Sequence, residues 1–549
     1  MKNVLSRIQK YMKKNFYIAL IVFLCAITGF LLGNIIAHKA NQSSFPALMQ
    51  KFVKSGRVEE MLSLINYHYV DSVDVNQLAE DAMIHIMAEL DPHSVYIPAE
   101  DLANVNSELE GSFSGIGVQF NIQNDTVMIV SVISGGPSER VGLMAGDRIV
   151  EVNDTAFVGK EVSNEKVIRK LRGPKNTKVK IGIKRYGTSE ILHYTITRGD
   201  IPVNSVDIAY MIEPEIGFIS VNKFSATTYN EFLTGMADLR AQGAKKFIVD
   251  LRENSGGLMD QAVMMVNEFL SRGQMIVYSE GKAYQRFDSR ADGSGNFIQQ
   301  PLIVLIDEFS ASASEIFAGA IQDNDRGLIV GRRSFGKGLV QQQMPLSDGS
   351  AVRLTVARYY TPTGRSIQKP YEMGKNDDYE MDIINRYMHG EFDTRDSIHL
   401  ADSLVYHTPK GRIVYGGGGI MPDIFVPRDT TGYTPYFSKV INYSYLYQFA
   451  FQYSDRNREK LNGYKTWQEM ERYLEKQNLL NDFVAFAETK DVKPNWQEIG
   501  KSKRLIERQL KAYISRNILG ETGFYPLFYK DDATVKQALH EMKTNEMLQ

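Results

Sequence analysis

The strongest constraint on the fold is an alternation between residues 201 and 370 of short apolar runs with amphipathic stretches. This alternation is typical of a mainly parallel sheet covered by helices. The expected strands are Ile216–Val221, Phe247–Leu251, Met275–Tyr278, Leu302–Ile306 and Leu328–Val330, and the expected helices are Tyr229–Ala241, Leu258–Ser271 and Ser312–Asp323. We therefore predict an α/β core over residues 201–429, with a polar, acidic insertion at 371–412.

The flanking segments have other patterns and predict further domains. Residues 46–110 carry apolar residues at helical spacing and predict a helical N-terminal region. Residues 111–200 alternate short strands with glycine turns and predict a small, mostly β domain. Residues 430–549 predict a helical C-terminal extension that contains no catalytic motif. A chain of 549 residues has room for these parts, since a domain commonly has about 100–200 residues.

The N-terminus predicts the compartment. Residues 1–14 carry five basic residues and no acidic residue, and residues 15–37 carry no charge. A helix over 15–37 would span about 35 Å, enough to cross a bilayer, and its positive flank would stay in the cytoplasm. We expect a single-pass anchor in the cytoplasmic (inner) membrane, with the rest of the chain facing the periplasm or the cell exterior. A cleaved signal peptide is the alternative.

Composition excludes several classes of protein. The 63 Lys and Arg residues nearly balance the 65 Asp and Glu residues, so no overall charge favours nucleic acid. The single cysteine, Cys25, excludes a disulfide framework and a cysteine-based zinc or iron–sulfur site. Because Cys25 falls in the expected anchor, the exported part has no thiol, which suits an oxidising space. The nine histidines include no H-E-x-x-H motif, which argues against a metalloprotease.

Two loops of the expected core carry residues suited to catalysis. Residues 306–316 join a strand to a helix through small residues, and free N–H groups at the helix start can stabilise an oxyanion. A serine there is either a nucleophile or a helix N-cap. Residues 331–338 place Lys337 among glycines, where burial would lower its pKa and make it a general base. An ordinary solvated lysine is the alternative. Gly338 stands where a phosphate-binding P-loop needs Ser or Thr.

Seven short motifs occur along the chain in a fixed order. They are Asp91–Ser94, Gly115–Val118, Asp250–Gly257, Ser310–Glu315, Phe335–Gly338, Thr355–Pro362 and Gly419–Asp423. Together they resemble the motifs of the carboxyl-terminal processing (tail-specific) serine proteases, over about residues 50–428. The resemblance implies an α/β multidomain fold with a ClpP/crotonase-like protease core and an inserted PDZ domain at 111–200. The role of His93 in the first motif is left open between catalysis and stabilising the turn.

The resemblance also implies roles for single residues. The implied roles are Ser312 as nucleophile, Lys337 as general base, Gln341 as the residue that orients the lysine, Ala313 and either Gly256 or Gly257 as oxyanion donors, and Gly115, Ile116, Gly117 and Val118 as the loop that binds a terminal carboxylate. Asp323 matches a position implicated in other members. No metal or organic cofactor is implied.

The expected function is that of a membrane-anchored, extracytoplasmic serine endopeptidase. It would cleave proteins or peptides near apolar C-termini, and its PDZ domain would recognise the C-terminus. The resemblance allows a homo-oligomer and an activating adaptor as further partners, and no nucleic acid is expected. Two alternatives stay open: a proteolytically inactive PDZ scaffold, and an adaptor that acts through its C-terminal helices. The aromatic residues between Tyr443 and Phe451 are then either a partner surface or core.

Overall fold

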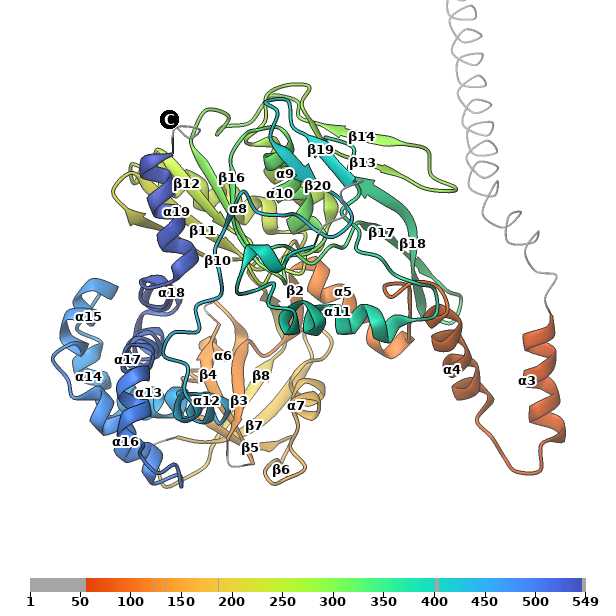
Figure 1. The fold of residues 1–549 in the computed structure, drawn as a ribbon. Coiled ribbons are helices and arrows are strands. Elements are labelled where there is room, and N and C mark those ends of the chain that lie inside the picture. The colour runs from red at the N-terminus through yellow and green to blue at the C-terminus, as the bar shows by residue number, and fades with distance from the viewer. Residues whose placement is uncertain (1–55, 124, 134, 186, 400–403, 546–549) are drawn as a thin grey trace, which may run out of the picture. The chain divides into compact units, whose positions relative to one another are not determined.

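The computed structural model describes residues 56–123, 125–133, 135–185, 187–399 and 404–545 (Figure 1). The expected basic segment 1–14 and the expected anchor 15–37 lie outside the described residues. Within the described ranges, no helix has both the length and the apolar character that crossing a bilayer requires. The chain divides into two units, one ending at His85 and the other beginning at Ile86.

The helical N-terminal region contains three described helices. They are α3 (Arg57–His68), α4 (Val75–Ala88) and α5 (Ala99–Glu110). α3 lies in the first unit and buries none of its residues, whereas α5 belongs to the second unit. All further elements belong to the second unit.

Six strands form the central sheet. In spatial order they are β10 (Val206–Glu213), β11 (Ile216–Val221), β12 (Lys246–Asp250), β15 (Leu302–Ile306), β16 (Leu328–Gly331) and β21 (Ile424–Phe425). β10 is antiparallel to β11, and all other neighbouring strands are parallel. The predicted α/β alternation is therefore confirmed, and the carboxyl ends of the parallel strands meet at one edge, where ligand sites of such sheets form.

One expected strand is confirmed as a strand but does not belong to this sheet. The run Met275–Tyr278 begins β13 (Met275–Glu280), which belongs to a second, antiparallel sheet. A short apolar run fits a parallel or an antiparallel strand equally well, so its sheet could not be chosen from the sequence. The other strands of the second sheet are β1 (Val95–Ile97), β14 (Phe287–Arg290), β17 (Leu339–Pro345) and β18 (Ala351–Tyr360).

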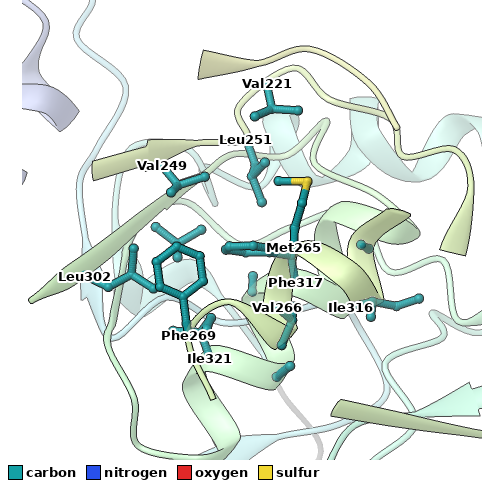
Figure 2. Packing of buried hydrophobic residues seen from close by; sticks show 14 of the residues in the cluster. Val221, Val249, Leu251, Met265, Val266, Phe269, Leu302, Ile316, Phe317 and Ile321 are labelled. Carbon is teal, nitrogen blue, oxygen red and sulfur yellow. The ribbon is translucent and has the colours of Figure 1, made fainter. Parts of the chain in front are cut away.

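One face of the central sheet is covered by helices that follow its own strands. Alternate strand residues such as Val249 point to this face, because side chains alternate along a strand. Figure 2 shows Val249 and Leu251 beside Met265 and Phe317 in this layer. The covering helices are α8 (Thr228–Ala241), α9 (Met259–Asn267) and α10 (Ala313–Asp323).

The opposite face is covered by α19 (Ala533–Thr544), from a distant part of the chain (Figure 1). Val535 and Met542 of α19 are buried with the other set of alternating strand residues, which includes Phe218 and Ile248. The C-terminal extension is thus partly a layer of the core. Its remaining helices pack around an apolar core of their own, except that α18 buries Phe524 and Leu527 in a small separate cluster with Ala512 of α17. They are α12 (Pro435–Asn442), α13 (Tyr445–Arg456), α14 (Arg458–Leu461), α15 (Trp467–Leu474), α16 (Leu479–Glu488), α17 (Trp496–Leu519) and α18 (Glu521–Tyr529).

The small β domain is inserted between two paired strands. The entering strand β2 (Ser112–Gly115) is antiparallel to the leaving strand β9 (Gly199–Pro202). Between them a sheet and two helices enclose a separate apolar core. These elements are β3 (Val118–Gln123), β4 (Thr126–Val132), α6 (Pro137–Arg140), β5 (Arg148–Val152), β6 (Thr155–Ala156), α7 (Asn164–Leu171), β7 (Lys178–Lys184) and β8 (Leu192–Thr197).

The expected insertion 371–412 contains little regular structure besides one helix. Its described elements are α11 (Asn376–Met388), the 3₁₀ turn η1 (Arg395–Ser397) and β19 (Val405–His407), and β20 (Ile413–Tyr415) follows it. β19 and β20 form an antiparallel pair. α11 buries Tyr379 and Arg386, so the insertion is packed on the protein rather than projecting from it.

We predict that Val535→Asp destabilises the protein by at least about 2 kcal/mol, because it places a charge without a partner on the buried face of the sheet. His540→Asp is the matched control, since His540 is an exposed residue of the same helix. Urea denaturation of both variants measures the effect. Equal unfolding midpoints would contradict a core role for α19.

Candidate active site

The serine loop, residues 307–312, joins β15 to α10. Ser312 lies directly before the first helical residue, Ala313. Its backbone has φ +53° and ψ −112°, a conformation that costs a residue other than glycine about 1–3 kcal/mol. Strain of this size persists only where the surrounding structure fixes the residue, and it is commonly found at functional sites.

The hydroxyls of the other two serines in the S-A-S-A-S motif already donate hydrogen bonds to backbone carbonyls. Both are fully buried. The Ser310 hydroxyl donates to the Leu251 carbonyl at 2.8 Å, and the Ser314 hydroxyl donates to the Asn254 carbonyl at 2.8 Å. Ser312 is the serine of the three that lines a cavity. The geometry therefore distinguishes Ser312 from the other two serines as the candidate nucleophile, which their spacing in the sequence could not do.

The lysine loop, residues 332–338, joins β16 to β17. Lys337 is partly buried, and its Nζ donates to Gln341 Oε1 on β17 at 3.0 Å. Burial lowers the pKa of the Lys337 amine, and the charge of Arg353 lowers it further, whereas Asp91 and Glu315 act in the opposite direction. This environment favours the general-base interpretation over an ordinary solvated lysine, because a lowered pKa brings the amine closer to its neutral, basic form.

A cavity of about 400 Å³ brings the expected residues together. Ser312, Lys337 and Gln341 all line it, as do Gly256 and Gly257. Its wall also includes apolar side chains, which suit an apolar side chain of a bound peptide. The apolar wall is formed by Leu109, Phe224, Leu258, Met259, Ile316, Leu339 and Val340.

The glycine loop, residues 251–258, joins β12 to α9 and approaches Ser312 closely. Gly256 has φ +100°, and a Cβ at this position would lie 2.7 Å from Ser312 Cβ and 3.0 Å from the Ala313 nitrogen. Only glycine fits both the conformation and the space. The Gly256 N–H donates to Asn254 Oδ1 at 2.9 Å. Of the two expected oxyanion donors, Gly257 is therefore the better candidate, because the Gly256 N–H is already bonded.

The glycine loop is tied to the C-terminal extension. Arg252 pairs with Asp250 of β12 and, through Nη1, with Asp532 at 2.9 Å. Asp532 also caps the start of α19 by accepting from the Val535 N–H. The loop beside Ser312 thus depends on the same helix that covers the sheet.

Glu315 joins the serine loop to the lysine loop. Its carboxylate is fully buried and accepts four hydrogen bonds. Oε2 accepts from the N–H of Ser312 at 2.9 Å and of Lys337 at 2.8 Å, and Oε1 accepts from the Gly336 N–H at 2.7 Å and the Ser334 hydroxyl at 2.5 Å. Burial raises the pKa of Glu315 to about 7, although these four donors favour the ionised form. The sequence did not assign Glu315 a role, although a glutamate three residues after a helix N-cap is a known capping pattern.

Asp323 has a structural role. Its carboxylate is fully buried and lies 2.6 Å from Arg365 Nη2, which is also buried. Thr363 donates to the same carboxylate from its hydroxyl at 2.7 Å. Asp323 does not line the cavity that holds Ser312, so its carried-over catalytic role is not supported.

The expected carboxylate-binding loop lies between β2 and β3. Gly117 has φ +78°, and a Cβ there would lie 2.9 Å from Ile201 Cδ1. Ile116 is buried, and its carbonyl accepts from the Ser138 N–H at 2.9 Å. A glycine is therefore required at position 117, in the turn between the end of β2 at Gly115 and the start of β3 at Val118.

Three segments of the chain match family models. Residues 215–381 match Peptidase family S41, residues 114–194 match the PDZ domain, and residues 436–520 match a family of unknown function. A carboxy-terminal-processing protease of Bartonella bacilliformis is 35% identical over 322 residues, which are 57% of this chain and 72% of that protein. The carboxy-terminal processing protease CtpA of Bacillus subtilis is 35% identical over 359 residues, 65% of this chain and 75% of that protein. The chain belongs to peptidase family S41.

This S41 peptidase is a serine-type peptidase of the carboxy-terminal processing kind, as the resemblance implied. Among solved structures, it is similar to a photosystem II D1 C-terminal processing protease, with 27% identity over 68% of this chain and 87% of that chain and a TM-score of 0.34. A PDZ domain of a carboxy-terminal protease from Vibrio cholerae in complex with peptide is 31% identical over 16% of this chain and 97% of that domain, with a TM-score of 0.16.

We predict that Glu315→Gln lowers the free energy of unfolding by about 2–4 kcal/mol and the rate of proteolysis at least about tenfold. Each oxygen of the Glu315 carboxylate accepts two hydrogen bonds, and the glutamine amide replaces one of these oxygens with an NH₂ group. The two buried donors at that position then lose their acceptor. Glu372→Gln is the control, because the Glu372 side chain is 72% exposed. Denaturation and peptide hydrolysis measure the two effects. A variant as stable and as active as the wild type would show that the loops hold together without this carboxylate.

Proposed function

We propose that Ser312 and Lys337 form a Ser–Lys dyad that hydrolyses peptide bonds near the C-termini of proteins. The main support is that the strained serine and the partly buried lysine line one cavity. The peptidase family and the names of the relatives support the same reaction.

In this proposal, neutral Lys337 removes the proton of the Ser312 hydroxyl as its oxygen attacks the scissile carbonyl carbon. The developing oxyanion accepts hydrogen bonds from the N–H groups of Ala313 and Gly257, a contribution of about 3–4 kcal/mol per donor in comparable sites. The C–N bond then breaks, and protonated Lys337 gives its proton to the leaving amine. Water next attacks the ester carbon as Lys337 takes its proton, and Lys337 then gives that proton to the departing Ser312 oxygen, which restores the neutral amine and the free hydroxyl. Acid and free enzyme are released.

The PDZ domain is proposed to select the substrate by its C-terminus. A peptide would add as a strand, with its terminal carboxylate on the N–H groups of the Gly115–Val118 loop and an apolar last residue in a pocket. The glycine-dependent turn at Gly117 supports this assignment. The match of residues 114–194 to the PDZ model supports it as well.

We further propose that residues 15–37 tether the enzyme to the cytoplasmic membrane, with the catalytic part outside the cytoplasm. The support is the charge-free stretch and its basic flank in the sequence. Homo-oligomerisation and an activating adaptor stay predictions.

The dyad predicts that Ser312→Ala and Lys337→Ala each lower the cleavage of an apolar-tailed protein about 10³-fold or more, because both groups act in the same proton transfer. Circular dichroism should show both variants folded. The matched controls are Ser271→Ala and Lys245→Ala, which change exposed residues and should keep full activity. A Lys337→Ala enzyme near full activity would exclude the lysine as the base.

Carboxylate recognition predicts that amidating the C-terminus of a peptide substrate lowers kcat/KM about tenfold or more, since a charge-assisted hydrogen bond contributes about 1.5–3 kcal/mol. Acetylating the N-terminus of the same peptide is the control and should leave kcat/KM unchanged. Equal rates for the amide and the free acid would rule out carboxylate capture.

A further inference from the structure

The turn Asp91–Ser94 lies beside the second sheet, between α4 and β1. β1 pairs with β18, in the register Val95 opposite Arg353. On its other side β18 pairs with β17, where Thr355 lies opposite Gln341. The turn therefore reaches the part of the sheet that carries Gln341, although Gln341 follows it by about 250 residues.

The Asp91 carboxylate fixes the turn to β18. Asp91 is buried, and its Oδ1 accepts from the His93 N–H at 3.0 Å, the Ser94 N–H at 3.1 Å and the Thr355 hydroxyl at 2.9 Å. Its Oδ2 accepts from the Ser94 hydroxyl at 2.5 Å, and that hydroxyl oxygen accepts from the Thr355 N–H at 3.0 Å. A buried carboxylate with this many donors has one stable arrangement, so the backbone of His93 is held in place.

The His93 carbonyl determines the orientation of the Gln341 amide. Gln341 Nε2 donates to this carbonyl, and Gln341 Oε1 accepts from Lys337 Nζ at 3.0 Å. A backbone carbonyl can only accept, so the NH₂ end of the amide must face His93. The oxygen end is then left for the Lys337 amine.

The His93 ring is held by the inserted helix α11. Its Nε2 lies 2.9 Å from the Tyr379 hydroxyl, and the two rings meet edge to face. Tyr379 also meets Phe335 of the lysine loop edge to face. Burial, and next the charge of Lys337, lower the pKa of His93 to about 4, so the ring is neutral at pH 7. His93 does not line the cavity that holds Ser312, so its contact with the site is through Gln341.

We propose that His93 is a positioning residue, whose backbone carbonyl fixes the Gln341 amide and thereby holds the Lys337 amine in the cavity of Ser312. This inference rests on the proposed role of Lys337 as the base. It gives the Asp91–Ser94 motif a function, and it makes the insertion 371–412 a support of the catalytic site through Tyr379.

The test is a double-mutant cycle on the full chain with His93→Ala and Gln341→Met. Each single variant is expected to lower kcat about 10–100-fold with little change in KM. His93→Ala keeps the backbone carbonyl but removes the ring that Tyr379 holds, so it acts by loosening the carbonyl that orients the Gln341 amide. In the Gln341→Met background it is expected to have no further effect, because no amide is left to orient. Effects on kcat that multiply would mean that His93 acts only through general stability, and would overturn the inference.

The pH profile is a second readout. Activity requires the neutral amine, so the rate falls on the acid side as Lys337 takes up a proton. The Gln341 oxygen favours the protonated amine, as do Asp91 and Glu315, while Arg353 opposes it. Loss of the oriented amide should therefore shift the acid limb of kcat about one pH unit lower. An unshifted limb in His93→Ala would contradict the inference.

Tyr379→Phe keeps the test decisive if His93→Ala fails to fold. It removes one hydroxyl and should lower kcat several-fold with the same direction of shift. Tyr387→Phe, the same change at a residue of α11 that is 45% exposed, is the matched control and should leave kcat unchanged. Full kcat in Tyr379→Phe would overturn the inference.

The failure of this inference can be distinguished from the failure of the proposed function. If Lys337→Ala is inactive while His93→Ala is fully active, only the role of His93 is wrong. An active Lys337→Ala enzyme would mean that Lys337 is not the base.

Discussion

The geometry of the candidate active site depends on one buried carboxylate. Glu315 accepts hydrogen bonds from the backbone of both Ser312 and Lys337, which belong to different loops. A buried carboxylate is stable only while its donors are present. The two loops therefore cannot separate without a large cost, and the Tyr359 hydroxyl adds to this link, at 2.6 Å from the Lys337 carbonyl and 3.0 Å from the Ser312 carbonyl. The strain at Ser312 is tolerated because its surroundings are fixed in this way.

Much of the core could be predicted because its signals are local. The strand Ile216–Val221 has the predicted limits, since a continuous apolar run bounded by turns allows few alternatives. The helix after the serine loop, α10, was expected for the same reason. The run Met275–Tyr278 shows what such local signals cannot predict: a short apolar run predicts a strand but not the sheet to which the strand belongs. The ordered motifs gave Ser312 and Lys337, and the structure places both in one cavity.

The remainder of the site depends on contacts between residues that are distant in the sequence. Gly256 and Gly257 were equal candidates for the oxyanion site until the Asn254 side chain was seen to occupy the Gly256 N–H. The insertion is polar and carries no motif that predicts a role, yet its Arg386 donates to the Ser334 carbonyl of the lysine loop at 3.0 Å. No periodicity or motif encodes such a contact, because each partner is ordinary in its own segment.

The position of α19 has a consequence for biosynthesis. The roughly one hundred residues between β21 and α19 take about 5–20 s to translate at about 5–20 residues per second. During that interval the strands can pair, but Phe218 and Ile248 lack their cover and Arg252 lacks Asp532. Until α19 docks, that face of the sheet stays exposed, and the glycine loop beside Ser312 lacks its ion pair with Asp532. In this order of assembly, the glycine loop beside Ser312 takes its final support from the last helix of the chain to be made.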